Sequence, residues 1–346
     1  MQDIKYIKRC FRLAQKGCGK TSPNPMVGCV VLDKNGNLIS EGYHKKYGEN
    51  HAERNALENL SIEQTEGGTL YVNLEPCNHY GKTPPCTDII IEKGIKKVVI
   101  SNLDPNPKAK GGVEKLKNAG IEVTTGILEH AGRELNEIFF TNIEENRPYV
   151  ALKCATTIDG KIATHTGDSK WITSTKARNY ARKLRKKYDA ILTTSTTIIA
   201  DNPEMKHKTK IIIDREFKTN FDYKIYKQGK CILFTNANII STPNNVEIAP
   251  YKDLKTCLDE IYTRKICSVF VEAGGNLLGS FVKENLFDKL YHFVASKILN
   301  DNNGKSAFNG DDIDFINGAK QLEIRSLKKL SPDILIEYKN IKPFGI

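Results

Sequence analysis

Four residues in the first quarter of the chain have side chains that can bind a metal ion and move a proton. His51 and Glu53 stand two residues apart in HAE, and Cys77 and Cys86 enclose the stretch NHYGKTPP. One imidazole and two thiolates suit tetrahedral zinc with a fourth position open for water. Zinc can lower the pKa of that water to about 7, and Glu53 can accept its proton without binding the metal.

A structural zinc site is the main alternative for these residues. Such a site normally has four protein ligands, and the other nearby candidate is His79, inside the loop itself. A His-x-Glu at the start of a helix, followed by a strand and then a Pro-Cys pair, is instead the pattern of zinc-dependent nucleobase deaminases. The sequence therefore predicts one catalytic zinc ion per chain, held by His51, Cys77 and Cys86, with Glu53 as the proton shuttle.

Alternating strands and helices position these residues. Residues 27–43 read as a β-hairpin because two apolar runs flank Asn35-Gly36, which favours a type I′ turn. Apolar spacing and Pro or Gly boundaries then predict further elements. The expected helices cover 51–60, 86–94 and 111–120, and the expected strands cover 69–74 and 96–101. This alternation predicts an α/β domain.

The chain of 346 residues is long enough for two domains, and a polar stretch at 142–150 marks the boundary. We predict domains at 1–145 and 146–346, both α/β. In the second domain Ser174 is a candidate N-cap of a basic helix, and residues 190–199 read as a strand.

Composition limits the class of protein. Hydrophobic residues make up 39% and charged residues 27%, which is typical of a globular chain. We found no apolar run long enough to span a bilayer and no signal-peptide pattern at the start, which predicts a cytoplasmic protein without a membrane partner. Nine cysteines, an odd number, fit a reducing compartment.

Charge is unevenly divided between the two halves. Residues 1–146 carry 19 basic and 19 acidic side chains, whereas residues 147–346 carry 33 basic and 22 acidic ones, giving the net charge of +11. A basic half favours anionic ligands such as phosphates or nucleic acid. Because lysines dominate this excess, surface composition alone is an alternative explanation.

Longer motifs carry a specific resemblance. The eight residues between Cys77 and Cys86 exceed the two found in cytidine, tRNA-adenosine and DNA deaminases. The segments SPNPMVGCVV, LEPCNHYGKTPPC and DPNP resemble the deaminase half of the bifunctional deaminase/reductase family of riboflavin biosynthesis. The later segments LKCATTIDGKIA, GDSKWITS and VEAGGNLLGSF are similar to its reductase half, so that the resemblance covers nearly the whole chain.

The resemblance implies what the first domain acts on. In that family a cytidine-deaminase-like domain hydrolyses the 2-amino group of 2,5-diamino-6-(5-phosphoribosylamino)pyrimidin-4(3H)-one and releases ammonia. By similarity Asn24, His44, His79 and Lys82 are candidates to bind this phosphoribosylated pyrimidine. For Lys82, a solvated loop lysine is the alternative.

The resemblance also implies an NADPH-dependent reductase, similar in fold to dihydrofolate reductase, that converts the ribosyl group to ribityl. No GxGxxG follows a strand, but Gly274 and Gly275 precede a helix whose start can receive a phosphate. By the same match, the expected cofactor-binding residues are Ala155, Trp171, Thr197, Asp201, Gly274, Gly275, Asn276, Leu277, Leu278, Gly279 and Ser280, with Asp201 also catalytic. The expected substrate-binding residues are Ser169, Arg185, Met205, Lys208 and Glu272. The family's self-association implies a homo-oligomer.

Three departures affect the reductase half. TTSTT at 193–197 replaces a glycine-containing segment, Asn202 stands where the family often has Asp, and Lys208 stands where it often has Arg. Lysine holds phosphate as a point charge, whereas arginine binds it through two hydrogen bonds.

Two other functions remain alternatives. One is a zinc deaminase of another nucleobase or of nucleic acid, with a basic C-terminal domain that is not a reductase. The long cysteine spacing and the single tryptophan argue against a nucleic-acid partner, because surfaces that bind nucleic acid interleave aromatic and basic residues. The other is a zinc protein without turnover.

Overall fold

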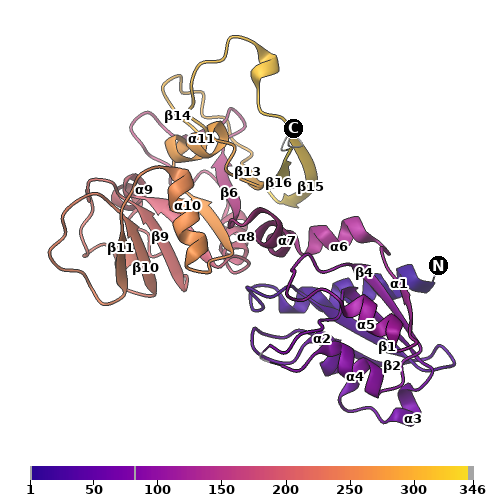
Figure 1. Cartoon of the computed structure of the whole chain (residues 1–346). Coiled ribbons are helices and arrows are strands. Elements are labelled where there is room, and N and C mark those ends of the chain that lie inside the picture. The colour runs from indigo at the N-terminus through magenta and orange to yellow at the C-terminus, as the bar shows by residue number, and fades with distance from the viewer. Residues whose placement is uncertain (1, 82, 342–346) are drawn as a thin grey trace. The chain divides into compact units, whose positions relative to one another are not determined.

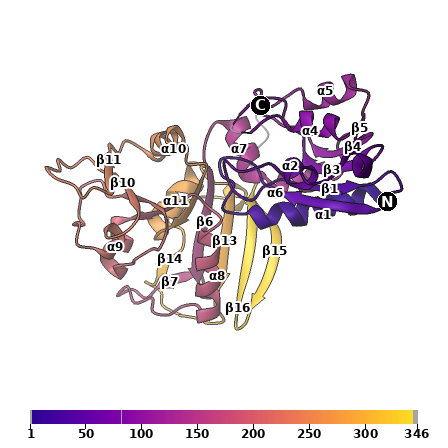
Figure 2. The same cartoon turned by 90° about the horizontal axis from the view of Figure 1, so that it is seen from below.

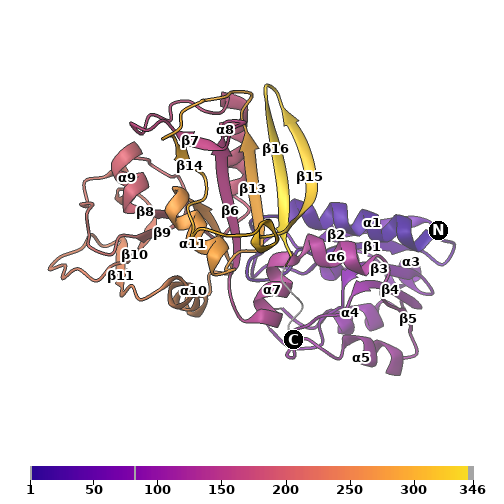
Figure 3. The same ribbon diagram turned by 90° about the horizontal axis from the view of Figure 1, so that it is seen from above.

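The computed structural model describes residues 2–81 and 83–341, and it divides into two compact units. The units are Met1–Asn146 and Arg147–Ile346, so the division falls one residue from the predicted boundary. Figures 1, 2 and 3 show the chain in three orientations. Within the described residues, no helix is long and apolar enough to cross a membrane.

The first unit is built on a five-stranded sheet in the order β2-β1-β3-β4-β5, in which β1 is antiparallel to β2 and β3 while β3, β4 and β5 are parallel. Its elements are α1 (Gln2–Ala14), η1 (Gln15–Gly17), β1 (Gly28–Leu32), β2 (Leu38–Tyr43), α2 (Ala52–Leu57), α3 (Ile62–Thr65), β3 (Thr69–Leu74), α4 (Cys86–Glu92), β4 (Lys97–Asn102), α5 (Gly112–Asn118), β5 (Glu122–Thr124), α6 (Glu129–Leu135) and α7 (Glu137–Glu145).

Helices cover both faces of this sheet (Figure 1). Helix α1 packs Ile7 and Cys10 against Val30 on one face. Helices α2, α4 and α5 pack on the other, where Leu57 and Ile90 join a second buried cluster. Burial of these apolar side chains fixes the strand ends and helix starts that carry the predicted metal ligands.

The hairpin turn differs from its prediction. A type I′ turn needs positive φ at both central residues. Gly36 has φ +82°, but Asn35 is not among the positive-φ residues. The carboxylate of Asp33 instead accepts hydrogen bonds from the backbone N–H groups of Asn35 at 2.9 Å and Asn37 at 2.8 Å. The type I′ prediction is therefore wrong, because this side chain closes a longer loop.

The second unit is built on a nine-stranded sheet in the order β11-β10-β9-β8-β12-β6-β13-β16-β15, and β7 and β14 form a two-stranded sheet. Its elements are β6 (Tyr149–Thr156), β7 (Lys161–Ala163), α8 (Thr175–Arg185), β8 (Ala190–Thr194), α9 (Ser195–Asp201), β9 (Thr209–Ile213), η2 (Lys224–Tyr226), β10 (Lys230–Phe234), β11 (Val246–Ala249), α10 (Leu254–Thr263), β12 (Ser268–Glu272), α11 (Gly275–Lys283), β13 (Lys289–Val294), β14 (Lys305–Ser306), η3 (Ile316–Gly318), β15 (Leu322–Leu330) and β16 (Asp333–Asn340).

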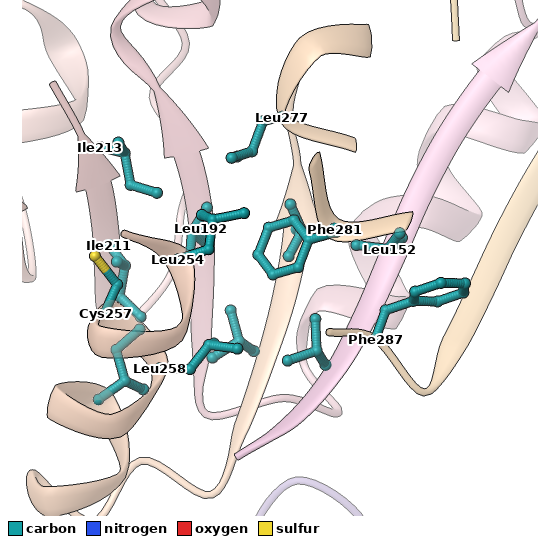
Figure 4. Close-up of a cluster of buried hydrophobic side chains, with 14 of the residues drawn as sticks. Leu152, Leu192, Ile211, Ile213, Leu254, Cys257, Leu258, Leu277, Phe281 and Phe287 are labelled. Carbon is teal, nitrogen blue, oxygen red and sulfur yellow. The ribbon is translucent and has the colours of Figure 1, made fainter. Parts of the chain in front are cut away.

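Seven strands of this sheet are parallel, from β11 to β13, and the β16–β15 pair adds an antiparallel edge, as Figure 3 shows. Helices α10 and α11 cover one face, where Phe281 and Leu258 pack against Leu152 and Leu192 (Figure 4). The α/β prediction for both halves is confirmed. Ser174 accepts a hydrogen bond from the Ala177 N–H at 3.3 Å, as expected of an N-cap.

The strand predicted at 190–199 is wrong in its second half. Strand β8 ends at Thr194, and residues from Ser195 onward form α9. The β-branched Thr and Ile residues there favour a strand by intrinsic preference. Packing overrides this preference, since Ile198 lies fully buried in a cluster with Met205 and Ile225.

Candidate active sites

The three predicted metal ligands come from two helix starts and one loop. His51 is the N-cap of α2, Cys86 is the first residue of α4, and Cys77 lies in the loop after β3. The Nδ1 of His51 lies 3.6 Å from the Sγ of Cys77 and 3.4 Å from the Sγ of Cys86. Ligand atoms of all three residues lie within 4.8 Å of one another. One metal ion can therefore contact all three.

The electrostatics of this cluster suit metal binding. The pKa of the Cys77 thiol is lowered to about 4, first because Cys86 hydrogen-bonds to it and also because His51 does. The backbone N–H of Cys86 also donates to the Cys77 Sγ at 3.4 Å. Among the described residues the group has three members and does not include His79. Three ligands of this kind are the donor set of a catalytic zinc ion.

Glu53 lies beside the three ligands and has a buried carboxylate oxygen that a metal-bound water could satisfy. It lies in the first turn of α2, its side chain is 3% exposed, and its Oε2 has no hydrogen-bond partner. Burial raises the pKa of Glu53 to about 7. A buried carboxylate oxygen without a partner is costly unless a ligand supplies a donor. A water on a zinc ion held by these three residues is such a donor, so the residues present fit the metal.

A cavity of about 320 Å³ opens onto this cluster, and its lining includes His51, Glu53 and Cys77. The predicted substrate contacts Asn24, His44 and His79 line the same cavity, whereas Lys82 lies outside the described residues. Asn24 Nδ2 lies 3.4 Å from His44 Nε2, and His44 Nδ1 lies 3.1 Å from the Asn50 carbonyl oxygen. These contacts fix the polar side chains of Asn24 and His44 in the cavity that contains the metal ligands.

Sequence reasoning did not assign several polar residues of this cavity to the site, among them Glu75, Asp104 and Asn106. Glu75 accepts backbone N–H groups from Asp104 at 3.2 Å and Val113 at 3.0 Å. Asp104 follows the carboxyl end of β4, next to the end of β3 that leads to Cys77. Its place at the carboxyl end of a parallel strand is the signal that could have found it.

A second and larger cavity, of about 870 Å³, lies in the C-terminal unit. Gly274, the N-cap of α11, and Gly275 form one wall, and Thr194 and Ile213 at the ends of β8 and β9 form another. A Cβ on Gly274 would have no neighbour within 4 Å, whereas one on Gly275 would lie 2.3 Å from the Ser306 carbonyl oxygen. The first turn of α11 therefore faces open space large enough for a dinucleotide.

Two family models match the chain. The cytidine and deoxycytidylate deaminase zinc-binding region matches residues 1–102, and the RibD C-terminal domain matches residues 148–336. The riboflavin biosynthesis protein RibD of Aquifex aeolicus is 41% identical over 97% of this chain and 98% of its own, and that of Actinobacillus pleuropneumoniae is 38% identical over 99% and 96%.

Solved structures agree over the full length. Acinetobacter baumannii RibD superposes with a TM-score of 0.91 at 33% identity, covering 99% of both chains. The diaminohydroxyphosphoribosylaminopyrimidine deaminase/5-amino-6-(5-phosphoribosylamino)uracil reductase of Thermotoga maritima superposes with a TM-score of 0.88 at 37% identity, covering 98% of this chain and 99% of its own. The chain belongs to the RibD family. It is a bifunctional deaminase and reductase of riboflavin biosynthesis, as the resemblance predicted.

The larger cavity in the C-terminal unit contains part of the predicted cofactor set. Gly274, Gly275, Asn276, Leu277 and Ser280 line it. Leu278 is 1% exposed and packs in the core. A Cβ on Gly279 would lie 1.6 Å from the Asn309 carbonyl oxygen, so the loop that carries Asn309 can pack against the helix only because residue 279 has no side chain. Ala155, Trp171, Thr197 and Asp201 are not among the lining residues.

Two predicted substrate residues of the reductase contact each other. Arg185 donates from Nε to Glu272 Oε1 at 2.5 Å and from Nη2 to Oε2 at 3.0 Å. The Nζ of Lys153, which sequence reasoning missed, lies 3.9 Å from Glu272 Oε2. Burial would raise the pKa of Glu272, but the charges of Arg185 and Lys153 lower it overall. This cluster is a charged site at the carboxyl end of β12.

The remaining predicted reductase residues are more dispersed. Trp171 is 58% exposed, with the Arg178 guanidinium 4.2 Å from its ring centroid. Asp201 lies 3.7 Å from the Nζ of Lys170, the neighbour of Ser169. Lys208 is exposed, and Met205 is buried among apolar side chains. The described residues therefore do not bring this whole set into one cavity.

Proposed function

We propose that the N-terminal unit deaminates 2,5-diamino-6-(5-phosphoribosylamino)pyrimidin-4(3H)-one, and that the C-terminal unit reduces the ribosyl group of the product to ribityl with NADPH. The unpartnered Glu53 Oε2 beside His51, Cys77 and Cys86 carries the first part of this proposal. The 870 Å³ cavity at the start of α11 supports the second part. Family membership supplies the substrate class.

In the deaminase unit each residue has a defined task. His51, Cys77 and Cys86 hold one zinc ion, which when bound polarises a water for attack on the pyrimidine carbon that bears the 2-amino group. Glu53 takes one proton from the attacking water and passes it to the ring nitrogen. It then takes the second proton from the hydroxyl group formed on the attacked carbon and gives it to the departing amine as the C–N bond breaks. Asn24 holds the pyrimidine edge, and His44, His79 and Lys82 hold the ribose and its phosphate.

In the reductase unit NADPH supplies the hydride. The first turn of α11, with Gly274 and Gly275 at its start, holds a cofactor phosphate. Arg185, Glu272 and Lys153 provide a charged contact for the sugar phosphate and its hydroxyl groups. Asp201, with Lys170 beside it, is proposed to lie next to the site of hydride transfer. Ser169, Met205 and Lys208 remain proposed substrate contacts.

A coupled assay tests this proposal on the full chain. The diamino-pyrimidinone ribotide is supplied, and ammonia release and loss of NADPH absorbance are followed separately. Ammonia release followed by NADPH oxidation is the expected result. Asp201→Ala should abolish NADPH oxidation and leave ammonia release unchanged; equal loss of both signals would contradict the division of labour. Release of ammonia without NADPH oxidation would contradict the reductase proposal alone.

An exposed apolar face supports the proposal that the chain forms homo-oligomers. On the edge pair of the large sheet, Leu327 lies opposite Ile336 and Ile324 lies opposite Tyr338. Ile324 and Leu327 are 56% and 67% exposed. Leu327→Glu should convert an oligomer to a monomer in light-scattering measurements; an unchanged mass would contradict this interface.

All nine cysteines lie in the described residues, and none forms a disulfide. Thiolates must also stay reduced to bind zinc. Both features support the proposal that the enzyme works in the cytoplasm. Fractionation of cells that express the full chain tests this, since activity in a membrane or extracellular fraction would contradict it.

A further inference from the structure

Arg215 occupies an unusual position in the reductase cavity. It lies two residues beyond the end of β9 and lines the cavity with Lys218 and Gly274. Its guanidinium carbon lies 4.3 Å from the centroid of the Tyr251 ring, and its Nη2 donates to the Tyr251 hydroxyl at 2.8 Å. Tyr251 is 9% exposed, so the surrounding residues fix the position of its ring. The aromatic face thus holds the guanidinium in one orientation before a ligand arrives.

The turn that carries Arg215 is fixed by a buried carboxylate. Asp214 is 1% exposed. Its oxygens accept the backbone N–H groups of Lys218 and Thr219, each at 2.9 Å, and the Thr219 hydroxyl at 2.8 Å. The Arg215 carbonyl oxygen accepts the Asn236 N–H at 2.9 Å. The turn therefore fixes the backbone of Arg215, and Tyr251 fixes its guanidinium group.

Charge distinguishes Arg215 from its neighbour Lys218. The Nζ of Lys218 lies 3.0 Å from Glu216, which also lines the cavity, so this lysine already has an anionic partner. Among the described residues no carboxylate is paired with Arg215; its side-chain contact is the neutral Tyr251 hydroxyl. An arginine without a carboxylate partner retains its full charge and can bind a phosphate through two parallel hydrogen bonds.

A dinucleotide has two sets of phosphates, and the cavity has two places for them. The start of α11 suits the bridging pyrophosphate. Arg215 lines the same cavity and comes from a different element, beyond the carboxyl end of β9. We propose that Arg215 binds the 2′-phosphate of the adenosine ribose and thereby selects NADPH over NADH. This inference rests on the proposed reductase function, which by itself needs a nicotinamide cofactor but not this residue.

Binding measurements on the full chain test the inference without turnover. Dissociation constants of NADPH and NADH, and of the fragments 2′,5′-ADP and 5′-ADP, are measured by calorimetry. Arg215→Gln should weaken NADPH and 2′,5′-ADP binding by about 10- to 100-fold, the value of a lost charge-assisted hydrogen-bond pair. The NADH and 5′-ADP constants should change less than about 2-fold, since neither carries the 2′-phosphate.

Two further variants keep the test decisive. Lys218→Gln should cost less than about 3-fold in NADPH affinity, because Glu216 already neutralises that lysine. Tyr251→Phe keeps the ring and should lie between the wild type and Arg215→Gln. Equal loss of NADPH and NADH binding in Arg215→Gln would overturn the inference, as would a larger selective loss in Lys218→Gln. If the wild type binds neither dinucleotide, the proposed reductase function fails instead.

Discussion

The backbone N–H of Cys86 donates to the Sγ of Cys77 over 3.4 Å, so that one metal ligand stabilises the charge of another. Cys86 is the first residue of α4, where backbone N–H groups have no partner within the helix. The same turn of helix therefore contributes both a sulfur ligand and a donor that favours the thiolate on Cys77.

Replacing Cys77 should remove the metal. A Cys77→Ser hydroxyl cannot form the thiolate, and two remaining ligands are too few for a stable zinc site. Elemental analysis should show less than about one tenth of the wild-type zinc content. Cys18→Ser, a change at an exposed cysteine, is the matched control and should keep one zinc ion per chain. Retention of zinc in Cys77→Ser would mean that other side chains bind it.

Replacing Glu53 should separate metal binding from catalysis. Glu53→Gln keeps the size of the side chain but cannot accept a proton. Zinc content should stay at one ion per chain, and ammonia release should fall by a factor of about 100 or more. Glu63→Gln, at an exposed position of α3, is the control. Activity of the Glu53 variant above about one tenth of wild type would refute the proton-shuttle role.

Breaking the Arg185–Glu272 pair should destabilise the C-terminal unit. Arg185→Met leaves the Glu272 carboxylate buried with Lys153, 3.9 Å away, as its remaining ion-pair partner. The free energy of unfolding should fall by roughly 3 kcal/mol. Lys283→Gln, which breaks the exposed pair with Asp311, should cost less than about 1 kcal/mol. Denaturant unfolding measures both, and equal costs would mean that the pair is solvated.

His292 should make the C-terminal unit less stable in acid. Burial lowers the pKa of His292 in the folded protein. Between that lowered pKa and the unfolded value of about 6.5, the unfolded chain binds more protons, so stability is present above pH 6.5 and falls as the pH drops below it. In urea unfolding at several pH values, His292→Gln should flatten this decline.

Thr156→Val is the matched control for the acid effect. It removes the 2.8 Å contact between Thr156 Oγ1 and His292 Nε2 but keeps the titrating ring. It should lower stability by about 1 kcal/mol at neutral pH and retain the decline in acid. A decline in His292→Gln as steep as that of the wild type would show that other groups cause it.

Two glycines near the cofactor cavity should respond differently to alanine. In Gly279→Ala the new methyl group would meet the Asn309 carbonyl oxygen at 1.6 Å, so the loop must move, at a cost of about 1–3 kcal/mol in unfolding free energy. In Gly274→Ala the methyl group has free space and should affect NADPH affinity more than stability. Thermal unfolding and calorimetry separate the two effects; equal stability losses would contradict the packing described for Gly279.

The sequence predicted local and chemically specific features well. The metal residues could be found because His51, Glu53, Cys77 and Cys86 have few other uses in that spacing. Arg215 could not, because its neighbours in space, Tyr251 and Gly274, come from distant segments of the chain. Helices α6 and α7 were not predicted, and α9 consists largely of residues that favour strands. In each case tertiary packing decides, and intrinsic preference does not.

The metal ligands also connect distant parts of the N-terminal unit. His51 is 26 residues from Cys77 and 35 residues from Cys86 in the sequence. An ion bound by all three closes these loops in the way a disulfide would, and it removes chain entropy from the unfolded state. A bound zinc ion would then serve as a cross-link in a chain without disulfides, and it would stabilise the N-terminal unit, which holds all three ligands, and not the C-terminal unit.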